Sequence, residues 1–391
     1  MPPRDPVHPL TPPAVLVLAW TRFGAWLAAG TRTRWLVVGV LLLATLPVVC
    51  SWPSFPANPD DRARWVDYWG KIVQVKIDDP WHDFMPQFPN DSHEAKLNFR
   101  LLLPLIGHTT GTGMTGVNVT RFALQGVLLL ALLLAAERAC GDRLAALGVA
   151  LAVAATYTGT CVWRDSCFWF DNCAQAFMAL ALLAGGPVLA GGSLLLALFV
   201  DERAVVALPL LLFYHWCVGS PRRVSAGLVA AVPMYLLICV GLGLMFHLHR
   251  SGGGLGSADV LIDNLEYTPL AIYFALEGGW IPVIFAVRGA TGGTAVAGLV
   301  LLGAALFPVA AAGVAGDFTR GASYGFPATL AAAAFLRHRL PGGGDTARLR
   351  RITTWAAVVS LAVPNLFIMR NIYLESCAPV RAVIWWLEGA R

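Results

Sequence analysis

The chain has 391 residues, of which 57% are hydrophobic and only 13% are charged, and its formal net charge is +5. Soluble domains average about 25% charged residues, so this composition excludes a disordered chain and a nucleic-acid-binding protein. Long Leu, Ala and Val runs, such as residues 126–136, lack the alternation of a barrel strand. The expected fold class is therefore an all-α, polytopic helical membrane protein.

Eleven apolar segments approximate one membrane crossing each. An earlier apolar run, residues 14–29, is interrupted by Arg22 and is interpreted as an interfacial helix, with a first crossing as the alternative. The fourth and fifth segments are short, so a re-entrant pair is the alternative there. The eleven segments are residues 35–51, 117–136, 144–162, 173–185, 187–200, 204–217, 225–246, 270–287, 294–315, 323–336 and 353–369.

Arginine in the short connectors predicts the orientation, because cytoplasmic loops carry an excess of Lys and Arg. The excess is largest around residues 348–351 and favours a cytoplasmic N-terminus and an external C-terminus. The expected organisation is a cytoplasmic or interfacial segment (1–34), a membrane domain (35–370) with a large external loop (52–116), and an external aromatic tail (371–391). Abundant Ala, Gly and Arg with little Lys are typical of GC-rich bacterial genomes, so a bacterial inner membrane is expected.

The external loop begins with a predicted amphipathic helix over residues 62–76. Trp65, Tyr68, Trp69, Ile72 and Val73 recur at helical spacing, and such aromatic residues favour the headgroup layer.

Acidic residues of this loop are candidates for general base catalysis. Asp60 and Asp61, just beyond the first crossing, are placed to deprotonate a hydroxyl group, although solvated loop acids are the alternative. Residues 78–83 combine three aspartates with a histidine, which suits a divalent cation but has no fixed ligand spacing.

A polar run that contains Asp91, His93 and Glu94 leads to Arg100 and an apolar half-helix. A guanidinium at the membrane boundary can bind phosphate in a bidentate manner. The alternative is that Arg100 snorkels and pairs with Glu94 or Asp91.

Asp201, Glu202 and Arg203 separate two apolar runs, where charges are costly and usually face a cavity or a partner. Later in the chain, Asp317 and Arg320 are three residues apart and share a helix face. For both groups a structural ion pair is the alternative interpretation.

Two further segments carry polar residues between apolar runs. Asp165 and Asp171 are candidates to line the same cavity. Glu277, followed by two glycines, indicates either a break in the eighth crossing or a packing site of small residues. One disulfide is also expected among three cysteines on the external side, and the sequence leaves open which pair of Cys161, Cys167 and Cys173 forms it.

The order of these segments resembles that of integral-membrane glycosyltransferases of the GT-C fold. The similarity rests on residues 98–104, in which an arginine precedes a Leu/Pro phrase, on the charged triplet 201–203 before an apolar helix with proline, and on the late Asp-x-x-Arg at 317–320. Here the triplet has an additional Asp and a reversed charge order.

The resemblance implies an inverting transfer of a sugar from a polyprenyl-phosphate donor to an envelope acceptor on the external face. It implies a catalytic base among Asp60, Asp61, Asp91 and Glu94, and no obligatory cofactor, with a divalent cation as an option. The residues that would hold the substrate and its phosphate are His93, Arg100, Asp201, Glu202, Arg203, Asp317 and Arg320.

Two other functional classes stay open at this point. A transporter or flippase for a lipid-linked or anionic solute would use broken helices at Glu277 and at residues 201–203 as a midplane site. A non-catalytic membrane subunit of an envelope-assembly complex would need none of these residues for chemistry.

Overall fold

The computed structural model describes residues 22–24, 26–27, 29–51, 59–88, 92–164, 168–249, 262, 264–314, 318–342, 344–362, 365–369 and 371–375. Within these ranges the side chains of residues 51, 59–65, 93, 164, 365–369 and 371–375 are not described.

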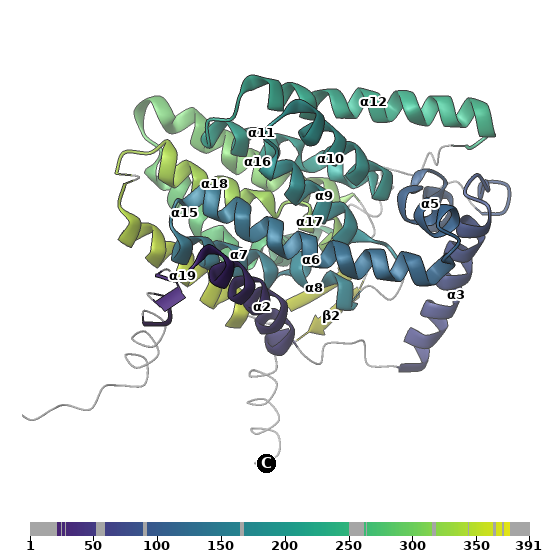
Figure 1. Cartoon of the computed structure of the whole chain (residues 1–391), viewed down its shortest axis with the longest axis horizontal. Coiled ribbons are helices and arrows are strands. Elements are labelled where there is room, and N and C mark those ends of the chain that lie inside the picture. The colour runs from purple at the N-terminus through teal and green to yellow at the C-terminus, as the bar shows by residue number, and fades with distance from the viewer. Residues whose placement is uncertain are drawn as a thin grey trace, which may run out of the picture.

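The described chain is a bundle of apolar helices, as predicted (Figure 1). By length and composition, five helices among the described residues could cross a membrane. They are α2 (Arg32–Ser51), α6 (Gly113–Cys140), α12 (Arg222–Phe246), α16 (Ala295–Gly313) and the continuous stretch of α14 (Thr268–Leu276), η3 (Glu277–Gly279) and α15 (Trp280–Gly289).

Shorter helices fill the space between these five. α7 (Arg143–Ala154) and α8 (Tyr157–Arg164) are bent by 55° and count as a sixth span if they are taken together. A helix such as α9, with 13 residues, extends only about 20 Å, less than the hydrocarbon thickness of a bilayer. The remaining short helices are α9 (Asp171–Leu183), α10 (Pro187–Val200), α11 (Leu208–Cys217), α17 (Phe318–Ser323), α18 (Pro327–His338) and α19 (Thr346–Ala362).

The end of the last predicted crossing is not helical, so this part of the prediction is wrong. α19 ends at Ala362, and β1 (Asn365–Met369) pairs with β2 (Asn371–Glu375) in an antiparallel hairpin. The sequence has Pro364 between α19 and β1, and proline lacks the amide hydrogen that a helix interior requires.

Within the described residues, breaks interrupt the third and the eighth predicted crossings. One is the bend between α7 and α8. The tenth segment is helical from Pro327 onward as α18, and the short helix α17 lies before α18 and overlaps the predicted segment only at Ser323. Glu277, which has a φ of 48°, separates α14 from α15, and this confirms the break that was one of the two interpretations of the sequence. The Gly278 amide donates to Ser360 Oγ at 3.0 Å, so α19 satisfies a backbone group at this break.

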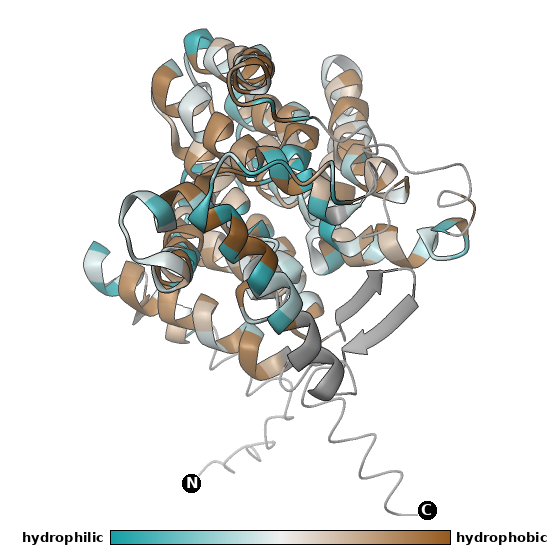
Figure 2. Cartoon of the chain, turned by 90° about the vertical axis from the view of Figure 1, so that its right-hand side faces the viewer, coloured by the Kyte–Doolittle hydropathy of each residue, from teal (hydrophilic) through white to brown (hydrophobic). Residues whose placement is uncertain are grey.

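The predicted cytoplasmic connectors and the predicted external segment lie at opposite ends of the bundle (Figure 1). Connectors predicted to share the cytoplasmic side lie together, because Arg350 binds Asp142, Arg143 donates to Gly30 O, and Arg138 donates to Ser220 Oγ. The opposite end carries the segment that precedes α6. Figure 2 views this end and shows mostly hydrophobic helices with hydrophilic residues between them.

That preceding segment contains α3 (Pro59–Asp78), α4 (His93–Lys96), η1 (Leu97–Phe99) and α5 (Leu102–Thr109). The predicted amphipathic helix is confirmed, since Trp69 and Val73 of α3 are buried, although Tyr68 is exposed. The Trp81 ring stacks on Phe246 at 3.9 Å, which joins the segment to the end of α12.

Small residues allow the helices to approach closely, and this contact is testable by thermal unfolding in detergent. A Cβ on Gly148 of α7 would lie 2.8 Å from the carbonyl group of Thr353 in α19, whereas a Cβ on Gly126 of α6 would meet no atom within 4 Å. We expect Gly148→Ala to destabilise the fold by about 1–3 kcal/mol, and Gly126→Ala to be neutral or slightly stabilising. Equal effects of the two substitutions would contradict the close packing of α7 on α19.

Candidate functional site

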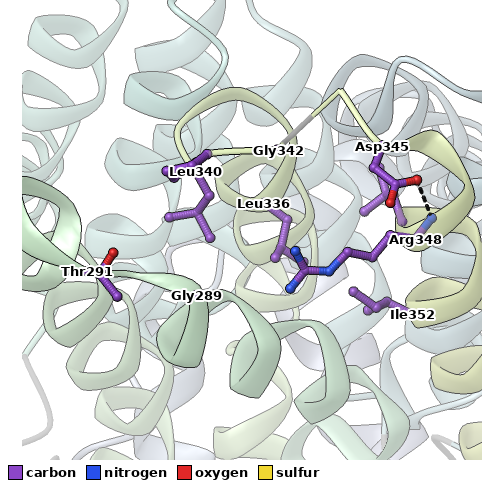
Figure 3. Close-up of a pocket in the computed structure, with 10 residues that line it drawn as sticks. Gly289, Thr291, Leu336, Leu340, Gly342, Asp345, Arg348 and Ile352 are labelled. Atoms are coloured by element: carbon purple, nitrogen blue, oxygen red, sulfur yellow. Dashed lines mark hydrogen bonds between the residues drawn. The ribbon is translucent and has the colours of Figure 1, made fainter.

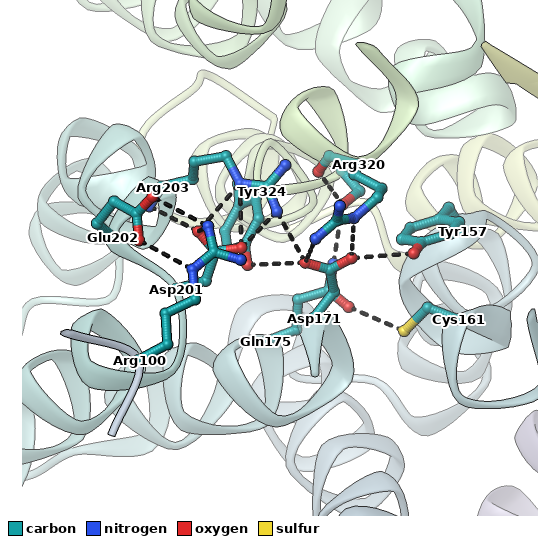
Figure 4. A network of polar contacts seen from close by, with 11 residues as sticks. Arg100, Tyr157, Cys161, Asp171, Gln175, Asp201, Glu202, Arg203, Arg320 and Tyr324 are labelled. Carbon is teal, nitrogen blue, oxygen red and sulfur yellow. Dashed lines mark hydrogen bonds and ion pairs between the residues drawn. The ribbon is translucent and has the colours of Figure 1, made fainter. Parts of the chain in front are cut away.

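Asp171, the first residue of α9, is fully buried and lies at the centre of a polar network (Figure 4). Its carboxylate accepts from Arg320 Nε at 2.6 Å and from Arg203 Nη2 at 3.1 Å. The hydroxyl groups of Tyr157 and Tyr324 donate to the same carboxylate at 2.9 and 3.3 Å. One acidic side chain therefore connects α8, α9, α17 and the segment after α10.

Asp201 follows the last residue of α10 and is also fully buried. Its carboxylate caps η2 (Glu202–Ala207) by accepting from the Arg203 amide at 3.0 Å. The same carboxylate accepts from Arg203 Nε at 3.0 Å and from Arg100 Nη2 at 3.4 Å. Arg203 therefore bridges the two buried aspartates.

Arg100 and Glu202 form the accessible edge of the network. Arg100 binds Glu202 in a bidentate manner, with Nε to Oε2 at 3.1 Å and Nη2 to Oε1 at 2.9 Å. The Glu202 side chain is 38% exposed, compared with 9% for Arg100 and none for Asp201. Solvent or a ligand therefore reaches the network at Glu202 first.

We call Arg100, Asp171, Asp201, Glu202, Arg203 and Arg320 the charge cluster. Its three guanidinium groups and three carboxylates sum to zero formal charge. Burying ions is expensive unless each is paired and hydrogen-bonded, and the contacts above satisfy that condition for every member. The balance of charges stabilises the cluster, because removal of one ion would leave another buried ion without a partner.

Aromatic rings cover the arginines of the cluster. The Arg320 Cζ lies 3.7 Å from the centre of the Trp169 ring, and the Arg203 Cζ lies 5.5 Å from that of Tyr324. Phe168 and Phe170, on either side of Trp169, have φ angles of 55° and 60°, a region that costs non-glycine residues of order 1 kcal/mol. This strained turn leads directly into α9 and Asp171.

Trp169 also contacts a second apolar group, formed by Trp69, Phe84 and Leu97. Trp69 belongs to α3, whereas Leu97 begins η1, three residues before Arg100. The external segment is therefore packed onto the aromatic residues that cover the charge cluster.

Uncharged polar side chains fix α17 behind the cluster. Gln175 donates to Ser323 Oγ at 2.9 Å, and Thr158 donates to the Ser323 carbonyl at 3.3 Å. The buried Cys161 thiol contacts the Gln175 side-chain oxygen at 3.5 Å. Neither Cys161 nor Cys173, both among the described residues, is part of a disulfide, and every pairing of the expected bond needs one of them, so that expectation is wrong. Cys167 itself lies outside the described residues.

A second polar group joins the external segment to the end of α12. Asp83 Oδ2 and His249 Nδ1 are 2.5 Å apart, and Asn98 donates to both Asp83 Oδ1 and the His249 carbonyl. Burial alone would raise the pKa of Asp83, but hydrogen bonds from His249, the Met85 amide and Asn98 lower it below its ordinary value.

The structure brings together five of the predicted site residues: Arg100, Asp201, Glu202, Arg203 and Arg320. The proposed pairing of Arg100 with Glu94 is wrong, because Glu94 instead accepts from the Tyr68 hydroxyl at 2.6 Å. Arg320 pairs with Asp171, and the predicted partner Asp317 lies outside the described residues, as does Asp91.

For the remaining candidates, Asp60, Asp61 and His93, the structure describes the backbone but not the side chains. Asp60 and Asp61 lie in the first turn of α3, about 12 Å along the helix from Tyr68, and His93 begins α4.

The contacts of Asp171 with Arg203 and Arg320 were not predicted from the sequence, and Tyr157 was not among the predicted site residues. The available signal was that Asp171 directly precedes an apolar run, as Asp201 directly follows one.

Among the described residues, no group of three or more His, Cys, Asp and Glu side chains is arranged to hold a metal ion. In the predicted cation cluster the carboxylates bind elsewhere: Asp78 accepts from Gln74, Asp79 from the Trp81 amide, and Asp83 from Asn98.

Comparison of the chain with protein-family models, with curated proteins and with solved structures found no match.

The Asp83 group predicts how stability depends on pH. The pKa of Asp83 is lower in the folded protein than in the unfolded chain, where an aspartate has a pKa of about 3.9. Its charge therefore stabilises the fold at pH values above about 3.9, and this stabilisation is lost as the pH falls through the folded-state pKa. We expect Asp83→Asn to lower the thermal midpoint at pH 7, and the difference from wild type to shrink below about pH 4. A difference that stays constant with pH would contradict the stabilising charge on Asp83.

Proposed function

We propose that the chain is a GT-C-like membrane glycosyltransferase that transfers a sugar from a polyprenyl-phosphate donor to an envelope glycan or lipid acceptor. The proposal includes eleven membrane segments, several of them too short to cross alone, and an external first loop that contains α3. It places the N-terminus in the cytoplasm of a bacterial cell and the charge cluster at the outer face of the inner membrane.

The observation that carries the proposal is the convergence of three arginines at one end of the bundle. Arg100, Arg203 and Arg320 come from segments far apart in the chain, and all three contact Asp171 or Asp201. Guanidinium groups bind phosphate oxygens in pairs, and a sugar transfer that releases a lipid phosphate needs fixed cations at the leaving group. The end of the bundle that carries them also carries the amphipathic helix α3, suited to the headgroup layer.

Access to the arginines is through Glu202. Its carboxylate occupies the bidentate position on Arg100 that a phosphate would take, and it is the most exposed acid of the charge cluster. In the proposed mechanism the donor phosphate displaces Glu202 into solvent and binds Arg100, while Asp201 keeps Arg203 in place. A carboxylate of the external segment, Asp60, Asp61, Asp91 or Glu94, accepts the proton of the acceptor hydroxyl group.

A second candidate is a non-catalytic membrane subunit of an envelope-assembly complex. The observation that favours it is the charge balance of the cluster, in which every arginine already has a carboxylate partner. In that case the charge cluster serves only to hold the helices together.

Native mass spectrometry with added undecaprenyl phosphate distinguishes the two functions. If the cluster binds phosphate, Arg100→Ala should abolish the bound lipid at matched folded yield, whereas Arg222→Ala, an arginine at the opposite end of the bundle, should retain it. Glu202→Gln should increase the bound fraction, because it removes the competing charge. If no lipid binds to wild type, or if both arginine variants bind it equally, the subunit function is favoured.

A further inference from the structure

Figure 3 shows a cavity of about 150 Å³. It lies among the arginine-rich connectors, at the end of the bundle opposite the charge cluster. It is formed where the end of α15, the loop before α16, the end of α18 and the start of α19 meet. Leu336, Leu340 and Ile352 supply apolar walls, and Thr291 and Arg348 supply polar groups.

Arg348 is the arginine that lines this cavity, and its side chain is exposed. Three neighbouring arginines are engaged in contacts of their own. Arg350 binds the Asp142 carboxylate with two nitrogen atoms, Arg143 donates to the Gly30 carbonyl, and Arg339 donates to the Trp216 carbonyl. Within the described part of the chain, the guanidinium of Arg348 has no hydrogen-bond or ion-pair partner, and only its backbone amide is engaged. Figure 3 shows this guanidinium between Leu336 and Ile352, inside the group of lining residues.

The one acidic residue of the lining does not neutralise Arg348. Asp345 Oδ1 accepts from the Arg348 amide at 2.9 Å and so caps the start of α19 (Figure 3). The cavity therefore presents an uncompensated cation beside apolar walls. This combination suits a ligand that carries both a negative charge and a hydrocarbon chain.

We propose that this cavity binds the phosphate group of an anionic phospholipid, with Arg348 as its cationic ligand and Leu336, Leu340 and Ile352 in contact with the acyl chain. Basic pockets between helices on the cytoplasmic side of membrane proteins bind lipid headgroups in this way, and the surrounding arginines attract anionic lipids to the same end. A free phosphate ion shares the charge but would gain nothing from the apolar walls. The inference is independent of the proposed sugar transfer, because the two sites lie at opposite ends of the bundle.

Lipid titration followed by native mass spectrometry tests the proposal. Full-length protein in neutral detergent is titrated with phosphatidylglycerol, with phosphatidylcholine in a parallel series and with inorganic phosphate as a competitor. Arg348→Gln should weaken phosphatidylglycerol binding about fivefold, the effect expected for one basic residue near a lipid surface. Arg351→Gln is the matched control, since it removes the same charge from a position of α19 that is equally exposed but does not line the cavity, and it should weaken binding less than Arg348→Gln does.

Arg348→Lys, which keeps the charge, should retain most of the binding and shows that any loss in Arg348→Gln is not a folding defect. Equal weakening in Arg348→Gln and Arg351→Gln would overturn the proposal in favour of general surface charge. Equal binding of phosphatidylcholine by wild type, or displacement of phosphatidylglycerol by inorganic phosphate at matched concentration, would overturn the assignment to an anionic lipid.

Discussion

The contact of Asp171 with Arg203 and Arg320 is the constraint on which the rest of the structure depends. An aspartate without solvent exposure can stay charged in an apolar bundle only if cations and hydrogen-bond donors surround it, and two arginines and two tyrosines do so. These four partners come from α8, η2, α17 and the turn that follows α17. The requirement to satisfy one carboxylate therefore fixes how segments that are far apart in the sequence meet.

The external segment is held by the same arrangement. Arg320 lies against Trp169, Trp169 packs with Trp69 of α3 and Leu97 of η1, and Arg100 follows directly after η1 to bind Glu202. α3 is thus connected to the charge cluster both through aromatic packing and through an ion pair. An exposed glutamate beside buried arginines is the feature that makes this end of the bundle suitable for exchange with an anionic ligand, whereas the buried aspartates serve to position the arginines.

Sequence patterns predicted the elements better than their contacts. The bounds of α10 agree with its apolar run because Pro187 and Asp201 mark its two ends, and the amphipathic spacing identified α3. Helical periodicity carries no information on breaks that tertiary contacts satisfy, and so the bend between α7 and α8 was missed. The hairpin after α19 was missed although Pro364 in the sequence argues against a continuing helix. Charges within apolar surroundings identified Arg100 and residues 201–203, since each is costly unless partnered. The ion pair within the triplet, offered as the alternative interpretation, is present between Arg203 and Asp201. The partner of Arg100 was not predicted, because pairing across about 100 residues depends on how the helices pack.

The most direct test of this account is a double-mutant cycle on Asp171 and Arg320, read as thermal stability in detergent. Asp171→Asn leaves a buried arginine excess, and the loss of one partner of a buried ion pair typically costs about 3–5 kcal/mol. Asp171→Asn combined with Arg320→Gln restores zero net charge in the charge cluster. If Asp171 and Arg320 stabilise each other, the double variant should lose less stability than the two single variants lose in total, as is typical of residues in contact. Strictly additive losses would show that Asp171 and Arg320 act independently and would contradict the central role of their pairing.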